Sequence, residues 1–134
     1  MPETSSPSSR YVFVYGTLRK GDDNDITRLA PAPQFVGHAS IEGVMHHLGA
    51  YPGVRLAPGR VVVGEVYAIE PALELKLDEI EMLYPEQKDE YFKREIAVQV
   101  DGRTLSCVLY EINPSYIVGR PVIESGDWVR GRHL

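Results

Sequence analysis

Apolar and polar positions along the chain predict a series of short strands. Residues 11–15 form a β-branched and aromatic run that ends at Gly16, which is typical of a strand buried on both faces. Residues 35–48, with a weak point at Gly43, and the valine-rich residues 60–69 predict further strands. The N-terminal half of the chain therefore has the pattern of a β-rich domain.

The clearest local signal is the Asp101-Gly102 pair between two β-rich runs. Such a pair predicts a hairpin with a tight primed turn, whose arms would be residues 92–100 and 103–112. We expect another turn at residues 51–53, because Pro52 presets φ and the glycine after it tolerates positive φ. Residues 113–134 contain Pro114, Gly119, Pro121 and Gly126, and we expect turns there with at most one short strand.

One segment predicts an amphipathic helix. Pro71 suits a first helical position. The apolar positions after it recur at spacings of four, three and four residues and share one face; they are Leu73, Leu77, Ile80 and Tyr84. Residues 25–30 predict one or two further helical turns, which Pro31 would end.

These elements predict an α+β, mainly β fold: a small, mostly antiparallel β-barrel with one principal helix and short helical turns. The chain of 134 residues has the usual size of one domain. We expect residues 10–134 to form that domain, and the Ser/Pro-rich residues 1–9 to be a flexible lead.

Composition excludes several classes of function. The formal net charge is -5 and no Lys/Arg-rich run occurs, whereas nucleic-acid binding normally needs a basic patch. No run of about 18 apolar residues predicts a membrane span, and the first residues do not read as a secretory signal. Cys107 is the only cysteine, so an intrachain disulfide is excluded. These features fit a cytoplasmic protein.

Among the acidic residues of the predicted helix, Glu81 is the best candidate for proton transfer. At about 100° per residue it falls on the edge of the apolar stripe, where a side chain can enter a partly dry cavity. Desolvation there would raise the pKa of the carboxyl group and suit it to general acid/base catalysis near neutral pH. The alternative is a solvated residue on the flank of the helix.

The loop after the first strand, Tyr15-Gly16-Thr17-Leu18, is a candidate anion site. Gly16 allows a sharp turn and a close approach by a ligand, and successive N–H groups could hold a substrate carboxylate. The alternative is an ordinary strand-exit turn. The four histidines lack metal-ligand spacing, and no serine lies in a nucleophile-elbow motif.

These residues resemble the gamma-glutamylcyclotransferase-like family, in its gamma-glutamylamine cyclotransferase-like branch. Residues 12–21 resemble the family's opening signature, and Gly64-Glu65-Val66-Tyr67 its Gly-Glu-Val-Tyr strand. Residues 77–81 match the Leu-Asp-x-x-Glu helix, and Gly126-Asp127-Trp128 the common ending. The similarities follow one another in order from about residue 11 to residue 128.

The resemblance implies a cyclotransferase-type fold and the conversion of a gamma-glutamyl compound to 5-oxoproline without a metal or organic cofactor. It assigns the acid/base role to Glu81. The residues that it assigns to substrate binding are Tyr15, Gly16, Thr17, Leu18 and, in a Cys-x-x-Tyr segment, Tyr110. The expected partner is a small gamma-glutamyl substrate, with no nucleic acid and no membrane.

Two departures from the family concern the rim of the predicted pocket. Asp25 follows Asn24 where the family often has histidine, and Met82 follows Glu81 where it often has glycine. They bear on the identity of the substrate. Three alternatives stay open: a non-catalytic binding module for a glutamyl metabolite, an interaction protein with a vestigial pocket, and an amidase that releases glutamate. The sequence indicates neither the released amine nor the oligomeric state.

Overall fold

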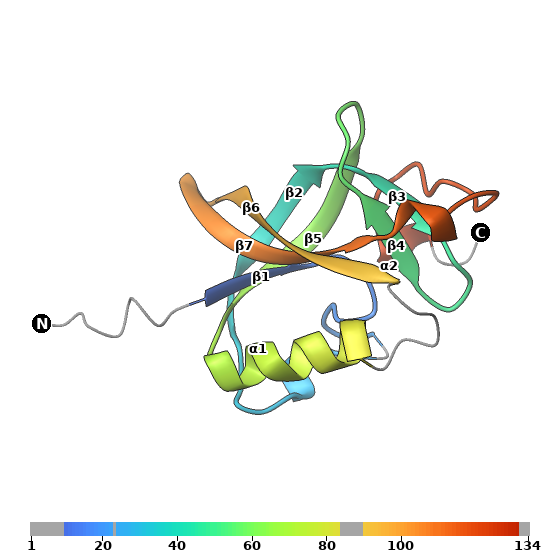
Figure 1. Cartoon of the computed structure of the whole chain (residues 1–134). Helices are drawn as coiled ribbons and strands as arrows, with labels where there is room; N and C mark the ends of the chain where they lie inside the picture. The colour runs from blue at the N-terminus through green and yellow to red at the C-terminus, as the bar shows by residue number, and fades with distance from the viewer. Residues whose placement is uncertain (1–9, 23, 84–89, 132–134) are drawn as a thin grey trace, which may run out of the picture.

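A five-stranded sheet in the order β2-β5-β1-β7-β6 forms the frame of the structure, a computed structural model that describes residues 10–22, 24–83 and 90–131 (Figure 1). The strands are β1 (Arg10–Val14), β2 (Gln34–Glu42), β3 (Val44–His47), β4 (Pro52–Arg55), β5 (Val61–Ile69), β6 (Tyr91–Val100) and β7 (Arg103–Ile112). The helical segments are η2 (Ile26–Arg28), α1 (Pro71–Asp78), η3 (Glu79–Leu83), η4 (Pro114–Tyr116) and α2 (Trp128–Gly131). The expected flexible lead, residues 1–9, lies outside the described residues.

Strand β1 lies at the centre of the sheet, antiparallel to β5 and parallel to β7. Alternate side chains of β1 enter two different apolar clusters, as the prediction of burial on both faces requires. Val12 and Val14 pack in the cluster that contains Leu73 and Leu77 of α1, and Phe13 packs in the other cluster. The central strand therefore ends, at residue 14, deep inside the molecule.

The predicted fold class is confirmed: the fold is mainly β, mostly antiparallel and has one principal helix. Hydrogen bonds do not close the described strands into a barrel, because the ladder stops at β2 and β6. The two edge strands, β2 and β6, nevertheless pack against each other. A Cβ atom at Gly37 of β2 would lie 2.8 Å from Cγ1 of Val100 in β6. The sheet thus curls until its outer strands meet without pairing.

The hairpin β6–β7 is confirmed, with residues 91–100 paired to residues 103–112. Asp101 and Gly102 both have positive φ, 49° and 78°, as a primed turn of type I′ requires. The predicted break at Gly43 is also present, since β2 ends at Glu42 and β3 begins at Val44.

The turn expected at residues 51–53 is wrong, because β4 begins at Pro52. The turn lies just before it, where the Leu48 N–H donates to the Tyr51 carbonyl at 3.0 Å and Gly49 has a φ of 109°. Proline is tolerated as the first residue of a strand, since it has no N–H to donate. Pro52 pairs with His47 at the end of the two-stranded sheet β3–β4.

Helix α1 begins at Pro71, as predicted, and lies beside the sheet (Figure 1). It buries Leu73 and Leu77 in the apolar cluster that contains Val12 and Val14 of β1. After Asp78 the helix continues as the π-helical turn η3, a wider turn than the regular wheel assumes. The fourth residue of the predicted stripe, Tyr84, lies outside the described residues. Across the described part of the chain, no helix has the length and apolar character needed to cross a membrane.

Candidate active site

A cavity of about 260 Å³ opens where β1 ends, beside η3. Its volume is close to the lower end of the range of small-molecule sites. The structure brings every predicted site residue to this cavity: Tyr15, Gly16, Thr17, Leu18, Glu81 and Tyr110 all line it. Sequence analysis did not assign four of its other polar or aromatic lining residues, which are Asn24, Tyr51, Glu90 and Tyr91.

The loop from Gly16 to Leu18 is shaped by backbone hydrogen bonds that leave its own N–H groups unused. The carbonyls of Gly16, Thr17 and Leu18 accept from residues 19, 24 and 26 at 2.9 Å each. Among the described residues, none accepts a backbone hydrogen bond from the N–H groups of residues 16–18. These donors are therefore available to an anionic or oxyanionic ligand group.

Glycine is required at position 16 for a reason that differs from the predicted one. Gly16 is not among the residues with positive φ. A Cβ atom there would lie 2.7 Å from Cγ of Pro52, closer than real Cβ contacts. The rigid proline ring of β4 therefore packs directly on the loop and leaves no room for a side chain.

A buried ion-pair cluster holds this loop from the side away from the cavity. The guanidinium of Arg19 donates to Glu65 at 3.1 Å and to Asp127 at 2.8 Å. Glu65 also accepts from the Lys20 N–H at 3.0 Å and from the Tyr67 hydroxyl at 2.8 Å. Three of the segments that carry the family resemblance, residues 12–21, 64–67 and 126–128, thus meet at this ion-pair cluster.

Glu81 extends from η3 into the cavity and is half-buried. Burial raises the pKa of its carboxyl group to about 7, and the nearby carboxylate of Glu90 contributes to the rise. The side chain keeps some exposure at the cavity, while the protein around the carboxyl group removes most of its hydration. A carboxyl group with this pKa can both accept and return a proton near neutral pH.

Four tyrosines surround the cavity, and each hydroxyl proton is already donated to a protein acceptor. The pairs are Tyr15 to the Tyr110 carbonyl (2.6 Å), Tyr51 to Glu90 (2.5 Å), Tyr91 to the Pro52 carbonyl (2.8 Å) and Tyr110 to Asp78 (2.6 Å). Burial is the main cause that raises the pKa of Tyr91 and Tyr110 well above the usual tyrosine value; Tyr15 then adds to the rise for Tyr91, and the hydrogen bond to Asp78 for Tyr110. The hydroxyls of Tyr91 and Tyr110 are therefore neutral, and none of the four hydroxyl protons is free for a ligand.

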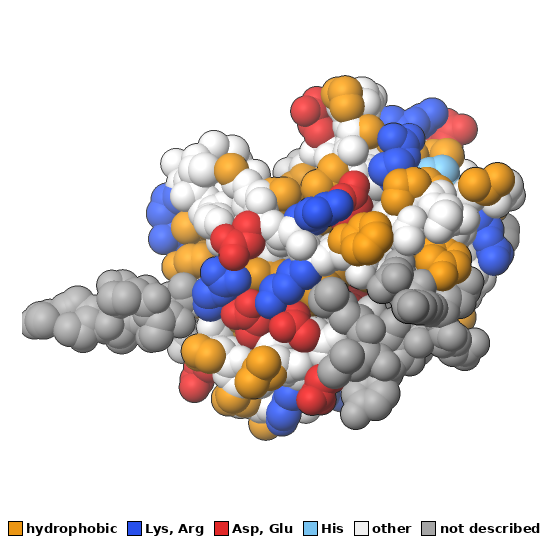
Figure 2. Space-filling model, in the orientation of Figure 1, with side chains coloured by type: hydrophobic (Ala, Val, Ile, Leu, Met, Phe, Trp, Pro, Cys, Tyr) orange, Lys and Arg blue, Asp and Glu red, His pale blue; other side chains and the backbone are white. Residues whose placement is uncertain are grey.

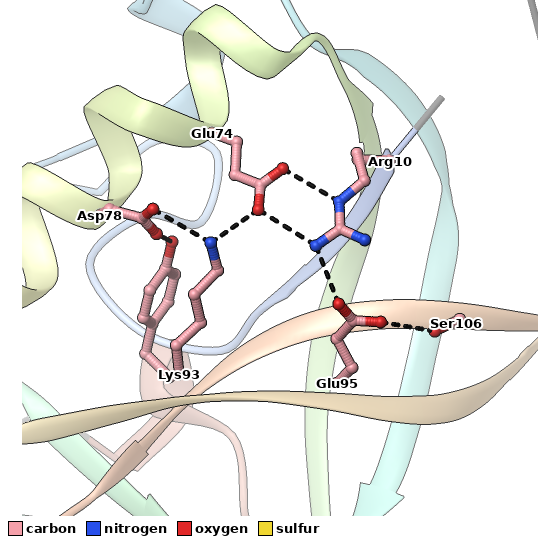
Figure 3. Close-up of polar contacts among 7 residues, drawn as sticks. Arg10, Glu74, Asp78, Lys93, Glu95 and Ser106 are labelled. Atoms are coloured by element: carbon pink, nitrogen blue, oxygen red, sulfur yellow. Dashed lines mark hydrogen bonds and ion pairs between the residues drawn. The ribbon is translucent and has the colours of Figure 1, made fainter. Parts of the chain in front are cut away.

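The hydroxyl of Tyr110 connects the cavity to a network of charged side chains between α1 and the sheet (Figure 3). Asp78, which accepts from Tyr110, also accepts from Lys93 of β6 at 3.0 Å. Lys93 bridges to Glu74 of α1, which pairs in turn with Arg10 of β1. Figure 2 shows acidic and basic side chains intermixed on this face. The network holds α1, and with it the start of η3, in a fixed position beside the cavity.

Comparison with known proteins identifies the family. The family model described as Gamma-glutamyl cyclotransferase, AIG2-like, matches residues 12–130. The chain belongs to this family. The match spans the residues that line the cavity, from the loop after β1 to the β7 residue Tyr110.

Two curated relatives support the assignment. A Vibrio cholerae protein named as a candidate gamma-glutamylcyclotransferase is 32% identical over 119 residues, which are 87% of this chain and 93% of the relative. A similarly named protein of Halalkalibacterium halodurans is 35% identical over 71 residues. That region is 53% of this chain and 62% of the relative, so the chain matches less than two thirds of that protein's length.

Solved structures have the same fold. YkqA from Bacillus subtilis superposes with a TM-score of 0.71 at 26% identity, over 91% of this chain and 40% of its own. An AIG2-like protein from Mus musculus superposes with a TM-score of 0.69 at 25% identity, over 89% and 88% of the two chains. The predicted cyclotransferase-like fold is therefore confirmed.

The lining residues that sequence analysis missed differ in how they could have been found. Tyr51 begins the turn predicted at residues 51–53, and Tyr91 directly precedes a predicted hairpin arm, but nothing in these patterns marks either side chain as facing a cavity. Glu90 precedes the predicted hairpin arm and belongs to no periodic pattern. Only the folded chain brings it beside Glu81.

Proposed function

We propose that this protein converts a gamma-glutamyl amine or gamma-glutamyl peptide into 5-oxoproline and a free amine. One observation carries the proposal: a carboxyl group with a pKa of about 7 shares a cavity with a loop of unused backbone N–H groups. The carboxyl group of Glu81 can manage a proton, and the loop can hold an anion. A gamma-glutamyl compound needs both, because it carries an α-carboxylate and a reactive α-amine.

In this proposal the α-carboxylate of the substrate lies against the N–H groups of residues 16–18, and the α-ammonium faces Glu81. Glu81 removes one proton from the ammonium, and the freed amine attacks the γ-carbonyl carbon of the same molecule. The new C–N bond closes a five-membered ring. Glu81 then returns this proton to the leaving nitrogen, and the old C–N bond breaks as the carbonyl re-forms. The ring nitrogen passes its second proton to the released amine, so that 5-oxoproline and the amine, as an ammonium, depart.

The chemistry requires no second substrate. Nucleophile and electrophile belong to one molecule, so the protein has to fold the substrate and to transfer protons. Well-oriented intramolecular reactions reach effective molarities of about 10⁵–10⁸ M. The reaction as written also needs no metal or organic cofactor, since Glu81 supplies the acid/base function.

The hydrogen bonds of the cavity indicate which groups can stabilise the oxyanion that forms on the γ-carbonyl. The tyrosine hydroxyls are unsuited, because their protons are donated within the protein. Suitable donors are the unused loop N–H groups and the side-chain amide of Asn24. The amide uses one of its two protons on Thr17 at 3.0 Å. One such donor is worth roughly 3–4 kcal/mol of transition-state stabilisation in other enzymes.

The first prediction tests Glu81. Glu81→Gln keeps the size of the side chain but removes the ionisable carboxyl group. Turnover should therefore fall by at least about 100-fold with the fold retained. The measurement is 5-oxoproline release, by mass spectrometry, from gamma-glutamyl-lysine, gamma-glutamyl dipeptides, glutathione and gamma-glutamyl polyamines.

Glu79→Gln is the matched control, because Glu79 lies two residues earlier in the same turn and is exposed. It should leave turnover unchanged. Near-normal 5-oxoproline release by folded Glu81→Gln protein would contradict the assigned role. Release of free glutamate instead of 5-oxoproline by the native chain would indicate an amidase.

A further inference from the structure

Glu90 is a buried carboxylate that lines the cavity and that the proposed reaction has not used. Its residue surface is only 2% exposed, and one carboxylate oxygen, Oε2, accepts from the Tyr51 hydroxyl at 2.5 Å. In the described part of the chain, no donor reaches the other oxygen, Oε1. A buried carboxylate is normally paired with a cation or held by several donors, because desolvation of a charge is unfavourable.

The contrast with Glu65 shows what Glu90 lacks. Glu65 is buried to a similar degree, 6% exposed, yet it accepts hydrogen bonds from an arginine, a backbone N–H and a tyrosine. Among the described residues, Glu90 accepts a side-chain hydrogen bond only from the tyrosine. No lysine, arginine or histidine occurs among the described residues that line the cavity. The described lining residues thus provide an acceptor without a cation that would satisfy it.

The remaining polar groups of the cavity divide into donors and acceptors by element. Donors come from the loop of residues 16–18 and from Asn24, whereas the two carboxylates come from η3 and from the residue before β6. A zwitterionic α-amino acid group matches this division, with its carboxylate at the loop and its ammonium at the carboxylates.

We propose that Glu90 is a second substrate-contacting residue, whose free carboxylate oxygen accepts a hydrogen bond from the α-ammonium group of the gamma-glutamyl substrate. This inference rests on the proposed function. It divides the work between two carboxylates: Glu90 holds the ammonium, and Glu81 removes its proton. Holding the nitrogen at a fixed point also orients it toward the γ-carbonyl carbon.

The electrostatics of the cavity are consistent with two carboxylates that share one cation. Glu90 lies close enough to Glu81 to contribute to its raised pKa. The other titratable groups that face the pair are the hydroxyls of four tyrosines: Tyr15, Tyr51, Tyr91 and Tyr110. A bound ammonium would relieve the repulsion between the two carboxylates, which no protein cation relieves in the described cavity.

The experiment pairs a change in the protein with a change in the ligand. The two ligands are the γ-methylamide of L-glutamate and the same compound without its α-amino group. Both are measured by calorimetry in a Glu81→Gln background, so that neither reacts. With Glu90 present, the amino ligand should bind about 10- to 100-fold more tightly, the range for hydrogen bonds to charged groups. Adding Glu90→Gln should bring the two affinities within about threefold.

Glu70→Gln, at the exposed residue before α1, is the control and should keep the full preference. A preference that survives Glu90→Gln unchanged would overturn this inference and leave the proposed function intact. Failure of both ligands to bind the Glu81→Gln protein would contradict the proposed function, and this inference with it.

A second variant covers the case in which Glu90→Gln does not fold. Glu90→Asp keeps the charge but withdraws the carboxylate by one methylene group, and thermal unfolding checks that it is folded. It should lose part of the preference for the amino ligand. Full retention of the preference by folded Glu90→Asp protein would also overturn the inference.

Discussion

At the scale of single residues, Glu81 combines a chemical advantage with an energetic disadvantage. Burial raises its pKa from a usual value of 4.5 to about 7. The folded protein therefore keeps a proton that the unfolded chain releases between these two pH values. Since the folded state binds more protons in this window, the free energy of unfolding falls as pH rises through it. Above pH 7 the ionised carboxylate opposes folding in full.

A second prediction follows for stability. Glu81→Gln replaces the titrating group by a neutral one of the same shape, so at pH 8 the variant should be more stable than the native chain. The expected gain is on the order of 2 kcal/mol, allowing for partial exposure. The gain should shrink toward pH 5. Urea unfolding at both pH values measures it, and Glu79→Gln should show no such dependence. An equal difference at both pH values would contradict the raised pKa.

The residues of the cavity could be predicted from sequence to different extents. Glu81 lies on the edge of a periodic apolar stripe, so helix geometry alone directed attention to it. Gly16 was predicted, but its reason was not, since the Pro52 ring that excludes a side chain comes from a distant strand. Glu90 had no local signal, because its importance depends on which groups surround it after folding.

At the scale of elements, the π-helical turn η3 is the segment that carries Glu81. Its position depends on α1, which precedes it without a break. A short helix is only marginally stable by itself and needs tertiary contacts. Here the apolar face supplies part of these contacts, and the Arg10–Glu74–Lys93–Asp78 network supplies the rest (Figure 3). Such π-helical turns occur frequently at functional sites.

The third prediction tests this network. Lys93→Met keeps the apolar stem but removes two partly buried ion pairs, to Glu74 and Asp78. The free energy of unfolding should fall by about 1–2 kcal/mol, more than for an exposed pair. Arg94→Met is the control, because Arg94 is 51% exposed and, among the described residues, forms an ion pair only with Glu111, besides lying over the Phe92 ring; its effect should stay below about 1 kcal/mol. Equal losses in urea unfolding would show that the network adds nothing.

Secondary-structure elements could be predicted where neighbouring residues determine them, and could not where contacts with distant parts of the chain determine them. The Asp101-Gly102 turn, the valine-rich strand and the helix after Pro71 all carry their own signals. Pro52 reads as a turn residue in isolation, but in the fold it starts an edge strand that needs no N–H at that point. Helix α2 has four residues, too few for any periodicity to show.

At the scale of the whole molecule, the Arg19–Glu65–Asp127 cluster joins segments from the beginning, the middle and the end of the chain. Arg19 directly follows the loop of residues 16–18, and Gly126 directly precedes Asp127. A Cβ atom at Gly126 would lie 1.8 Å from the Val61 carbonyl oxygen, so the terminal segment packs directly on β5. The segment around residues 126–127 therefore contacts both β5 and the residue that follows the cavity loop.

The fourth prediction concerns this cluster. Glu65→Gln leaves the buried Arg19 with only Asp127 as an anionic partner, and the free energy of unfolding should fall by about 3 kcal/mol. Glu124→Gln is the control, because its pair with Arg60 is exposed and 3.9 Å long; it should change stability by less than about 0.5 kcal/mol. Urea unfolding measures both. A similar small effect for the two variants would contradict a structural role for the cluster.

The central place of β1 in the sheet has a consequence for biosynthesis. This strand leaves the ribosome first, yet both of its hydrogen-bonding neighbours, β5 and β7, are translated much later. Nascent chains generally cannot complete such distant pairings before the partner strands emerge. The loop after β1 therefore cannot reach its final packing until translation has passed residue 112, the end of β7. A shortened chain that ends before β7 would lack one wall of the cavity, however long it had been given to fold.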